Sequence, residues 1–191
     1  METLEAIQLR RSVRRYLPDP VSDRDLETIL QAGLSAPSGL NLQPWYFLAL
    51  KSPEKRQELL DIMERVGGSI GEELSARFQD HPEVIAETTQ FIRTLGNAPV
   101  ILLVFLMRDD YADPRTALIS ASAAVENAIL AARNLGIGSC WLTAANQTGY
   151  DTEVRDHFAP GKGELVATVT LGYPAKWPAA VARRKERWAI L

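Results

Sequence analysis

Four arginines lie within six residues near the start of the chain, at Arg10, Arg11, Arg14 and Arg15, with Ser12 between them. Positive charges packed this closely repel one another, and a bound anion relieves the repulsion. A phosphate monoester carries nearly two negative charges at neutral pH and accepts paired hydrogen bonds from guanidinium groups. The segment therefore indicates a phosphate site, although a solvated basic surface explains the charges alone about equally well.

Three further segments have residue types that bear on a ligand site. A second basic cluster, 183–187, can supply the opposite side of the same phosphate site. The loop 36–44 is rich in proline, glycine and amide side chains, and amides can hydrogen-bond ring carbonyls and ring nitrogens. Taken alone, this loop is explained more simply as a structural connection. The stretch 136–144 is also ambiguous, because a helix end followed by an apolar strand is ordinary packing.

The composition excludes several other kinds of site. His81 and His157 are the only histidines and neither has the spacing of a zinc ligand, while Cys140 is the only cysteine. The sequence contains no G-x-S-x-G nucleophile motif, no P-loop and no complete dinucleotide fingerprint. We therefore expect no metal and no catalytic triad. The formal net charge of -3 also argues against general binding to nucleic acid or an anionic membrane.

The segments between these residues predict one domain in which strands alternate with helices. Capping residues and hydrophobic periodicity predict helices over 2–9, from Ser22 to about Gly33, from Ser52 to Gly67–Gly68, over 115–135 and over 152–158. Apolar runs predict strands over 45–50, 99–107, 139–143 and 164–171. The small residues of the helix over 115–135 favour close helix packing and a place near a subunit interface.

Two parts of the chain lie outside this pattern. Residues 68–96 are helical with an interruption near His81–Pro82, which suggests a lid, and residues 173–191 form a C-terminal arm. The longest apolar run, Pro99 to Met107, is about half of the roughly 20 residues that a membrane helix needs. With no apolar segment at the N-terminus, we expect a cytoplasmic protein without a membrane anchor.

Six segments, in this order, together resemble the FMN-dependent nitroreductase family. They are RRSVRRY at 10–16, APSGLNLQPWYF at 36–47, NAPVILLVF at 97–105, the alanine-rich helix through Glu126–Asn127, GIGSCWLTA at 136–144 and LGYP at 171–174. The similarity spans nearly the whole chain. No single segment is decisive, and the ordered set carries the resemblance.

The resemblance implies an α+β fold, with a mixed, mostly antiparallel central sheet flanked by helices, in an intertwined homodimer that binds FMN at the subunit interface. It implies that the phosphate is held by Arg10, Arg11, Ser12 and Arg14, together with Arg183 or Arg184 from the tail. The isoalloxazine ring is expected to lie against Pro37, Ser38, Gly39 and Asn41, from the partner chain. Leu142, Thr143 and Ala144 are expected beside N5 of the ring, where a backbone N–H can bond it.

The activity implied is reduction of an electron-poor acceptor (a nitroaromatic, a quinone or an enone) by NADH or NADPH. In this scheme hydride passes through flavin N5 in ping-pong kinetics, and the flavin does the chemistry without a catalytic side chain. A second possibility is a flavin-binding module that senses redox state or binds a partner without turnover. A nucleic-acid site is a weaker possibility, because no stacking aromatics alternate with the arginines.

Overall fold

The computed structural model describes residues 2–191, apart from the side chain of Glu72. Four strands form one sheet in the order β1-β2-β4-β3, with β1 at Trp45–Leu50, β2 at Val100–Leu106, β3 at Gly138–Leu142 and β4 at Leu165–Gly172. Each neighbouring pair is antiparallel, and a parallel bridge joins Ser12 to Ser139 outside these strands. The α+β class with a mostly antiparallel sheet is therefore confirmed.

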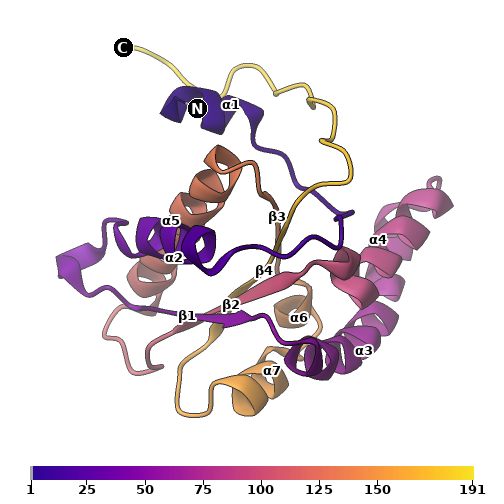
Figure 1. The fold of residues 1–191 in the computed structure, drawn as a ribbon, viewed down its shortest axis with the longest axis horizontal. Coiled ribbons are helices and arrows are strands. Elements are labelled where there is room, and N and C mark those ends of the chain that lie inside the picture. The colour runs from indigo at the N-terminus through magenta and orange to yellow at the C-terminus, as the bar shows by residue number, and fades with distance from the viewer. Residues whose placement is uncertain (1) are drawn as a thin grey trace.

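Helices cover both faces of this sheet (Figure 1). The α-helices are α1 at Thr3–Leu9, α2 at Asp23–Leu34, α3 at Pro53–Arg77, α4 at Pro82–Thr94, α5 at Pro114–Asn134, α6 at Ala144–Gln147 and α7 at Asp151–Phe158. Short 3₁₀ turns occupy Gly39–Asn41 and Leu95–Asn97. The predicted helices and strands are found with small shifts at their ends, apart from the end of α3.

Alternate residues of the central strand β2 enter two separate hydrophobic cores. Val100, Leu102, Val104 and Leu106 pack with α2 and α5 on one face, whereas Ile101, Leu103 and Phe105 pack with α3, α4, α6 and α7 on the other. Every residue of β2 and β4 is buried. Because successive strand residues point to opposite faces, a continuous apolar run is what a strand covered on both sides requires.

Capping residues fix where three of the helices begin. The Ser22 hydroxyl accepts a hydrogen bond from the backbone N–H of Asp25 at 3.0 Å, and Ser52 accepts one from Lys55 in the same way. These are the two serines that the sequence predicts as caps. For α5 the cap is Asp113, which accepts from the backbone N–H of Thr116 and precedes a proline in the first turn.

The predicted end of α3 at Gly67–Gly68 is wrong, because the helix continues to Arg77. Gly67 is buried, and a Cβ there would lie 2.4 Å from Cγ of Arg93 on α4. The glycine therefore lets α4 approach α3 closely. Glycine ends a helix when it adopts a left-handed conformation, and close packing of helices is a different reason for its presence.

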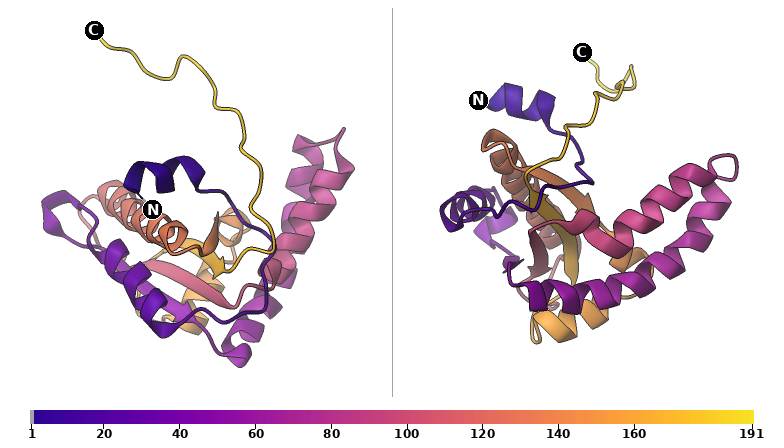
Figure 2. Two further views of the ribbon diagram at one scale, coloured as in Figure 1. Left: turned by 45° about the horizontal axis from the view of Figure 1, so that its top comes forward. Right: turned by 45° about the vertical axis from the view of Figure 1, so that its right-hand side comes forward.

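The second half of α3 and α4 form a helical hairpin that extends away from the sheet (Figure 2). After β4 the chain has no further helix or strand within the described residues, and its tail runs past α1. The tail is anchored near its start, where Arg133 of α5 lies 3.7 Å from the ring centroid of Trp177. Beyond residue 177 every residue is exposed.

Candidate functional site

The arginine-rich segment is held in an extended conformation along the edge of the sheet. After α1 ends, the backbone N–H of Val13 donates a hydrogen bond to the carbonyl of Ser139 in β3 at 2.9 Å. Val13 is fully buried and lies against Gly138, where a Cβ would come 2.7 Å from a Val13 methyl group. The buried valine therefore fixes which side of the segment faces the core, and its neighbours Ser12 and Arg14 point elsewhere.

Tyr16 anchors the far end of the same segment. Its hydroxyl donates a hydrogen bond to the carbonyl of Val13 at 2.7 Å and shares another, 2.6 Å long, with the hydroxyl of Thr170. Burial holds the pKa of Tyr16 well above its usual range, so the hydroxyl stays protonated and able to donate. Backbone bonds from Leu17 to Tyr173 and from Ala175 to Arg15 tie the start of the tail to this segment.

The first pocket joins the arginine segment to the tail, and its volume is about 200 Å³. Its lining consists of Arg10, Arg11, Ser12, Arg14, Pro178, Ala179, Val181 and Arg183. None of these residues is acidic. The tail arginine that reaches the pocket is thus Arg183, whereas Arg184 is absent from the lining.

The arginines of this first pocket are only partly neutralised by the rest of the chain. Arg10 lies 3.6 Å from the carboxylate of Glu126 on α5. Arg11 donates from one terminal nitrogen to the carbonyls of Gln8 and Arg10, and its buried Nε has no hydrogen-bond partner among the described residues. Buried donors are nearly always satisfied, so this orphan nitrogen and the carboxylate-free lining fit a bound anion.

The second pocket, of about 190 Å³, lies where β3 ends and α6 begins. It brings Leu142, Thr143 and Ala144, which the resemblance assigns to the ring, together with Arg14, which the resemblance assigns to the phosphate. The remaining lining is Ile70, Leu74, Thr88, Phe91, Ile92, Cys140, Trp141 and Gln147. The pocket is therefore mostly apolar, with one guanidinium group at its edge.

The second pocket contains a thiol that sequence reasoning did not assign. Burial raises the pKa of Cys140, with the positive charge of Arg14 acting in the opposite direction. The thiol therefore stays protonated and unreactive near neutral pH. No group of three or more His, Cys, Asp or Glu residues that could hold a metal occurs in the described part of the chain.

The loop that carries Pro37, Ser38, Gly39 and Asn41 is not part of either pocket. It lies near the N-terminal end of α5, where the backbone N–H of Gly39 donates to the Ser120 hydroxyl at 3.2 Å. Figure 1 places this loop at the opposite side of the molecule from the arginine segment. A single chain therefore does not bring the loop to the arginines.

The loop has a conformation of its own. Leu40, Asn41 and Gln43 have positive φ angles, and Leu40 is 95% exposed. The Ser38 hydroxyl accepts from the backbone N–H of Gln43, and Asn41 accepts from the Gln43 amide. These local bonds hold an irregular, outward-facing loop.

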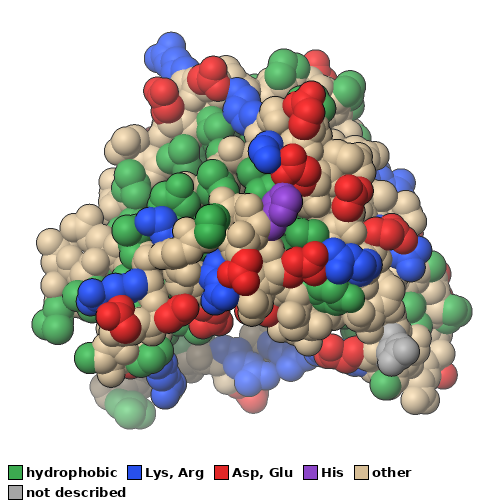
Figure 3. Space-filling view, turned by 90° about the horizontal axis from the view of Figure 1, so that it is seen from below, with side chains coloured by type: hydrophobic (Ala, Val, Ile, Leu, Met, Phe, Trp, Pro, Cys, Tyr) green, Lys and Arg blue, Asp and Glu red, His purple; other side chains and the backbone are tan. Residues whose placement is uncertain are grey.

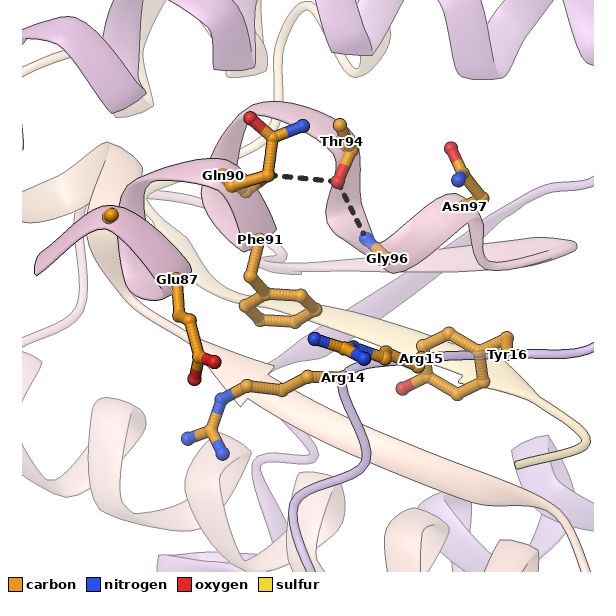
Figure 4. A pocket seen from close by; sticks show the side chains of 10 residues that line it. Arg14, Arg15, Tyr16, Glu87, Gln90, Phe91, Thr94, Gly96 and Asn97 are labelled. Carbon is orange, nitrogen blue, oxygen red and sulfur yellow. Dashed lines mark hydrogen bonds between the residues drawn. The ribbon is translucent and has the colours of Figure 1, made fainter. Parts of the chain in front are cut away.

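A third cavity, which sequence reasoning missed, lies between the arginine segment and α4 (Figure 4). Its volume is about 540 Å³. It is lined by Arg14, Arg15, Tyr16, Ala86, Glu87, Gln90, Phe91, Thr94, Gly96 and Asn97. Arg14 lines all three cavities, so they meet around this one residue. The α4 residues carry no sequence signal for a site, because their role depends on how the hairpin folds back.

One face of the molecule has mixed charge (Figure 3). Figure 3 shows the face seen from below, on which acidic and basic side chains lie close together around apolar ones. Among the helices described, none combines the length and the apolar character needed to cross a bilayer.

Known proteins resemble this chain along most of its length. The sequence profile of the nitroreductase family matches residues 7–173. A protein of Archaeoglobus fulgidus, named for NADH dehydrogenase or NAD(P)H nitroreductase activity, is 31% identical and aligns over 91% of this chain and 86% of its own. A 5,6-dimethylbenzimidazole synthase of Rhodobacter capsulatus is 31% identical over 70% of this chain and 67% of its own.

A solved structure has the same fold. The nitroreductase with bound FMN from Bacteroides fragilis NCTC 9343 superimposes with a TM-score of 0.72 at 28% sequence identity, covering 100% of this chain and 98% of that one. The family profile covers well over half of the chain, and the fold agrees with it. This chain therefore belongs to the nitroreductase family.

Proposed function

We propose that this protein is an FMN-dependent oxidoreductase that uses NAD(P)H to reduce an electron-poor acceptor, such as a nitroaromatic, a quinone or an enone, in ping-pong kinetics. The observation that carries the proposal is the carboxylate-free pocket that joins Arg10, Arg11 and Arg14 to Arg183 of the tail. A phosphate monoester there would neutralise the crowded guanidinium groups. The nitroreductase with bound FMN from Bacteroides fragilis supports FMN as the molecule that carries this phosphate.

The residues of the first pocket suit the phosphate of FMN. The guanidinium groups of Arg10, Arg11, Arg14 and Arg183 would donate to its oxygens, with Ser12 as a further donor. The orphan Nε of Arg11 would gain a partner. Because the backbone of the segment is already fixed by β3 and by Tyr16, little ordering remains to be done on binding.

The apolar second pocket suits the ring. Leu142, Thr143 and Ala144 would lie beside N5, and Phe91 and Ile92 would exclude water from that side. Arg14 lies between the two pockets and would favour negative charge on the nearby part of the ring. When bound, FMN supplies the redox chemistry, taking hydride from the nicotinamide and passing reducing equivalents to the acceptor. The buried, protonated Cys140 takes no part as a nucleophile.

We further propose a homodimer in which each chain supplies the loop at Pro37, Ser38, Gly39 and Asn41 to the partner's flavin. The exposed loop lies far from the arginines of its own chain, so a second chain has to bring it there (Figure 1). Apolar side chains that a dimer would cover are exposed on α1, α5 and the tail. They include Leu4, Ile7, Ile119, Val181 and Trp188.

The first test is the absorbance spectrum of the purified protein. We expect the absorption of a bound flavin, and heat or acid should release FMN that is identified by mass. The holoenzyme should oxidise NADH or NADPH when a quinone or nitroaromatic is present, and either reductant should bleach the flavin anaerobically. A colourless protein that is neither coloured nor thermally stabilised by added FMN would refute the proposal.

The same assay separates the enzyme from a non-catalytic flavin module. A redox sensor would bind FMN with the same residues but would not consume NAD(P)H repeatedly with any of the three acceptor classes. The 5,6-dimethylbenzimidazole synthase among the relatives makes it necessary to test acceptors of more than one kind.

A further inference from the structure

The 540 Å³ cavity beside α4 is well suited to a small charged ligand. It is larger than the first and second pockets and has the size of sites that enclose cofactor-sized molecules. Its polar groups come from Gln90, Thr94 and Asn97. Phe91 gives it an apolar surface.

Arg15 lines this cavity and neither of the other two. Its side chain is exposed and makes no ion pair or hydrogen bond with any residue that the structure describes. Its backbone is fixed, because its carbonyl accepts a hydrogen bond from Ala175 at 3.1 Å. The guanidinium group therefore extends from a rigid support without a carboxylate to neutralise it.

The charge in the cavity is positive overall. Arg14 and Arg15 lie on one side and Glu87 is the acidic lining residue (Figure 4). Figure 4 shows the Glu87 carboxylate near the guanidinium of Arg14, although the two form no ion pair of 4.0 Å or less. Arg14 also lies 5.8 Å from the ring centroid of Phe91.

The cavity adjoins the second pocket, since Arg14 and Phe91 line both. A ligand that reached the flavin in the second pocket could therefore extend into the cavity. The chain has no complete dinucleotide fingerprint, so the phosphates of a nicotinamide dinucleotide need another site. Small, uncharged acceptors have no group that requires Arg15.

Resting on the proposed function, we propose that this cavity binds the phosphate groups of the reducing nicotinamide dinucleotide, with Arg15 as the principal contact. Arg14 is shared with the flavin, and Glu87 lowers the affinity by repelling phosphate. Arg15 is thus a residue for recognition of the reductant, and takes no part in holding FMN.

The test uses the FMN-loaded holoenzyme and the tetrahydro analogues of NADH and NADPH, which bind without reacting. We expect Arg15→Ala to weaken binding of at least one analogue about tenfold, as for loss of one charge-assisted hydrogen bond, measured by calorimetry. Equal losses for both analogues would place the pyrophosphate at Arg15, and a loss confined to the NADPH analogue would place the 2′-phosphate there. Either result supports the proposal.

Three further variants test whether a loss of affinity in Arg15→Ala is caused by misfolding. Arg15→Lys should keep part of the affinity, and Glu87→Gln should tighten binding, which misfolding cannot produce. Arg24→Ala removes an exposed arginine of α2, outside all three cavities, and should change nothing. FMN content and reduction of the flavin by light should be the same in all of these proteins.

Unchanged affinity for both analogues in FMN-loaded Arg15→Ala would overturn this inference and leave the proposed function intact. Selective loss of affinity for a carboxylated nitroaromatic, with both analogues unaffected, would also overturn it. Failure of the wild-type protein to bind FMN would overturn the proposed function and this inference together.

Discussion

Single side chains in the arginine segment have separate tasks, although the sequence presents them as one basic cluster. Val13 and Tyr16 hold the backbone of the segment in place. Arg14 and Arg15 share the third cavity, beside α4, but only Arg14 also lines the first and second pockets.

Replacing Arg14 should therefore damage flavin binding more than replacing Arg15. We expect Arg14→Ala to weaken FMN binding about 10- to 100-fold, the range for one or two charge-assisted hydrogen bonds, because it removes a donor from the proposed phosphate site in the first pocket. Quenching of FMN fluorescence by the apoprotein measures this. Arg15→Ala is the matched control, and an equal loss of FMN in both variants would contradict the division of roles.

Tyr16→Phe should destabilise the fold without changing its shape. The hydroxyl makes the bonds to Val13 and Thr170, so its removal should lower the free energy of unfolding by about 1–3 kcal/mol. Urea denaturation measures the loss. The Tyr173 hydroxyl makes no hydrogen bond with a described residue, so Tyr173→Phe should cost less than about 0.5 kcal/mol. If both variants lost the same free energy of unfolding, the hydrogen bonds of the Tyr16 hydroxyl would contribute little to stability.

At the scale of elements, the α3–α4 hairpin contains one close contact, at Gly67. A Cβ at Gly67 would collide with Arg93, whereas a Cβ at Gly68 meets nothing within 4 Å. Gly68→Ala should stabilise the protein by about 0.5–1 kcal/mol through helix propensity. Gly67→Ala should destabilise it by about 1–3 kcal/mol because the helices must separate. Thermal unfolding of the two variants measures whether their stability changes in opposite directions. If both substitutions stabilised the protein, Arg93 would have to move aside freely.

The other side of α3 is joined to α7 by an ion pair and by a hydrogen bond. Arg65 contacts both carboxylate oxygens of Glu153 at 2.9 and 2.5 Å, and His157 of α7 contacts Glu58 at 2.8 Å. The hydrogen bonds from Arg65 lower the pKa of Glu153. These contacts fix the helix from which the hairpin extends.

The Arg65–Glu153 pair should make the stability of the protein sensitive to acid. A carboxylate whose pKa is lowered by folding adds stability above its unfolded pKa, and that stability is lost as pH falls through the folded value. Glu153→Gln should therefore lower the melting temperature at neutral pH by up to about 3 °C, since the pair is exposed. The difference from wild type should shrink below about pH 4. The exposed Glu27→Gln is the control, and a difference independent of pH would exclude the ion pair as its cause.

On the scale of the whole molecule, the tail supplies part of the lining of the first pocket. Arg183 lines the first pocket, yet residues 178–191 are all exposed. A segment with so little contact to its own chain is ordered more readily by a second chain. We therefore expect the tail to couple the proposed dimer to flavin binding.

Deleting residues 178–191 should leave a folded chain that has lost both properties. We expect a monomer by light scattering and FMN affinity at least about tenfold weaker, because Arg183 and the apolar tail contacts are removed together. Arg183→Ala should weaken FMN and keep the dimer, while Arg184→Ala should keep both. A truncated protein that remained dimeric would show that the interface lies elsewhere, for example on α1 and α5.

The sequence was sufficient to predict most of the helices and strands and to single out the basic residues that line the first pocket. Caps at Ser22 and Ser52 and the alternation of apolar residues depend on neighbours a few positions away, so they can be recognised without the fold. The arginine segment and Arg183 were chosen for their charge, and the structure brings them into one pocket.

Only the tertiary structure decided the features that depend on contacts between distant segments. Gly67 does not end a helix. It allows α3 and α4 to pack closely, because the side chain of Arg93 on α4 lies against it. The loop at Pro37 to Asn41 lies away from the arginines of its own chain, and the cavity at Arg15 forms because α4 folds back beside the segment. Local sequence determined which residues carry charge and which segments are helical or extended, whereas packing of the hairpin, the sheet and the tail determined which charges share a cavity.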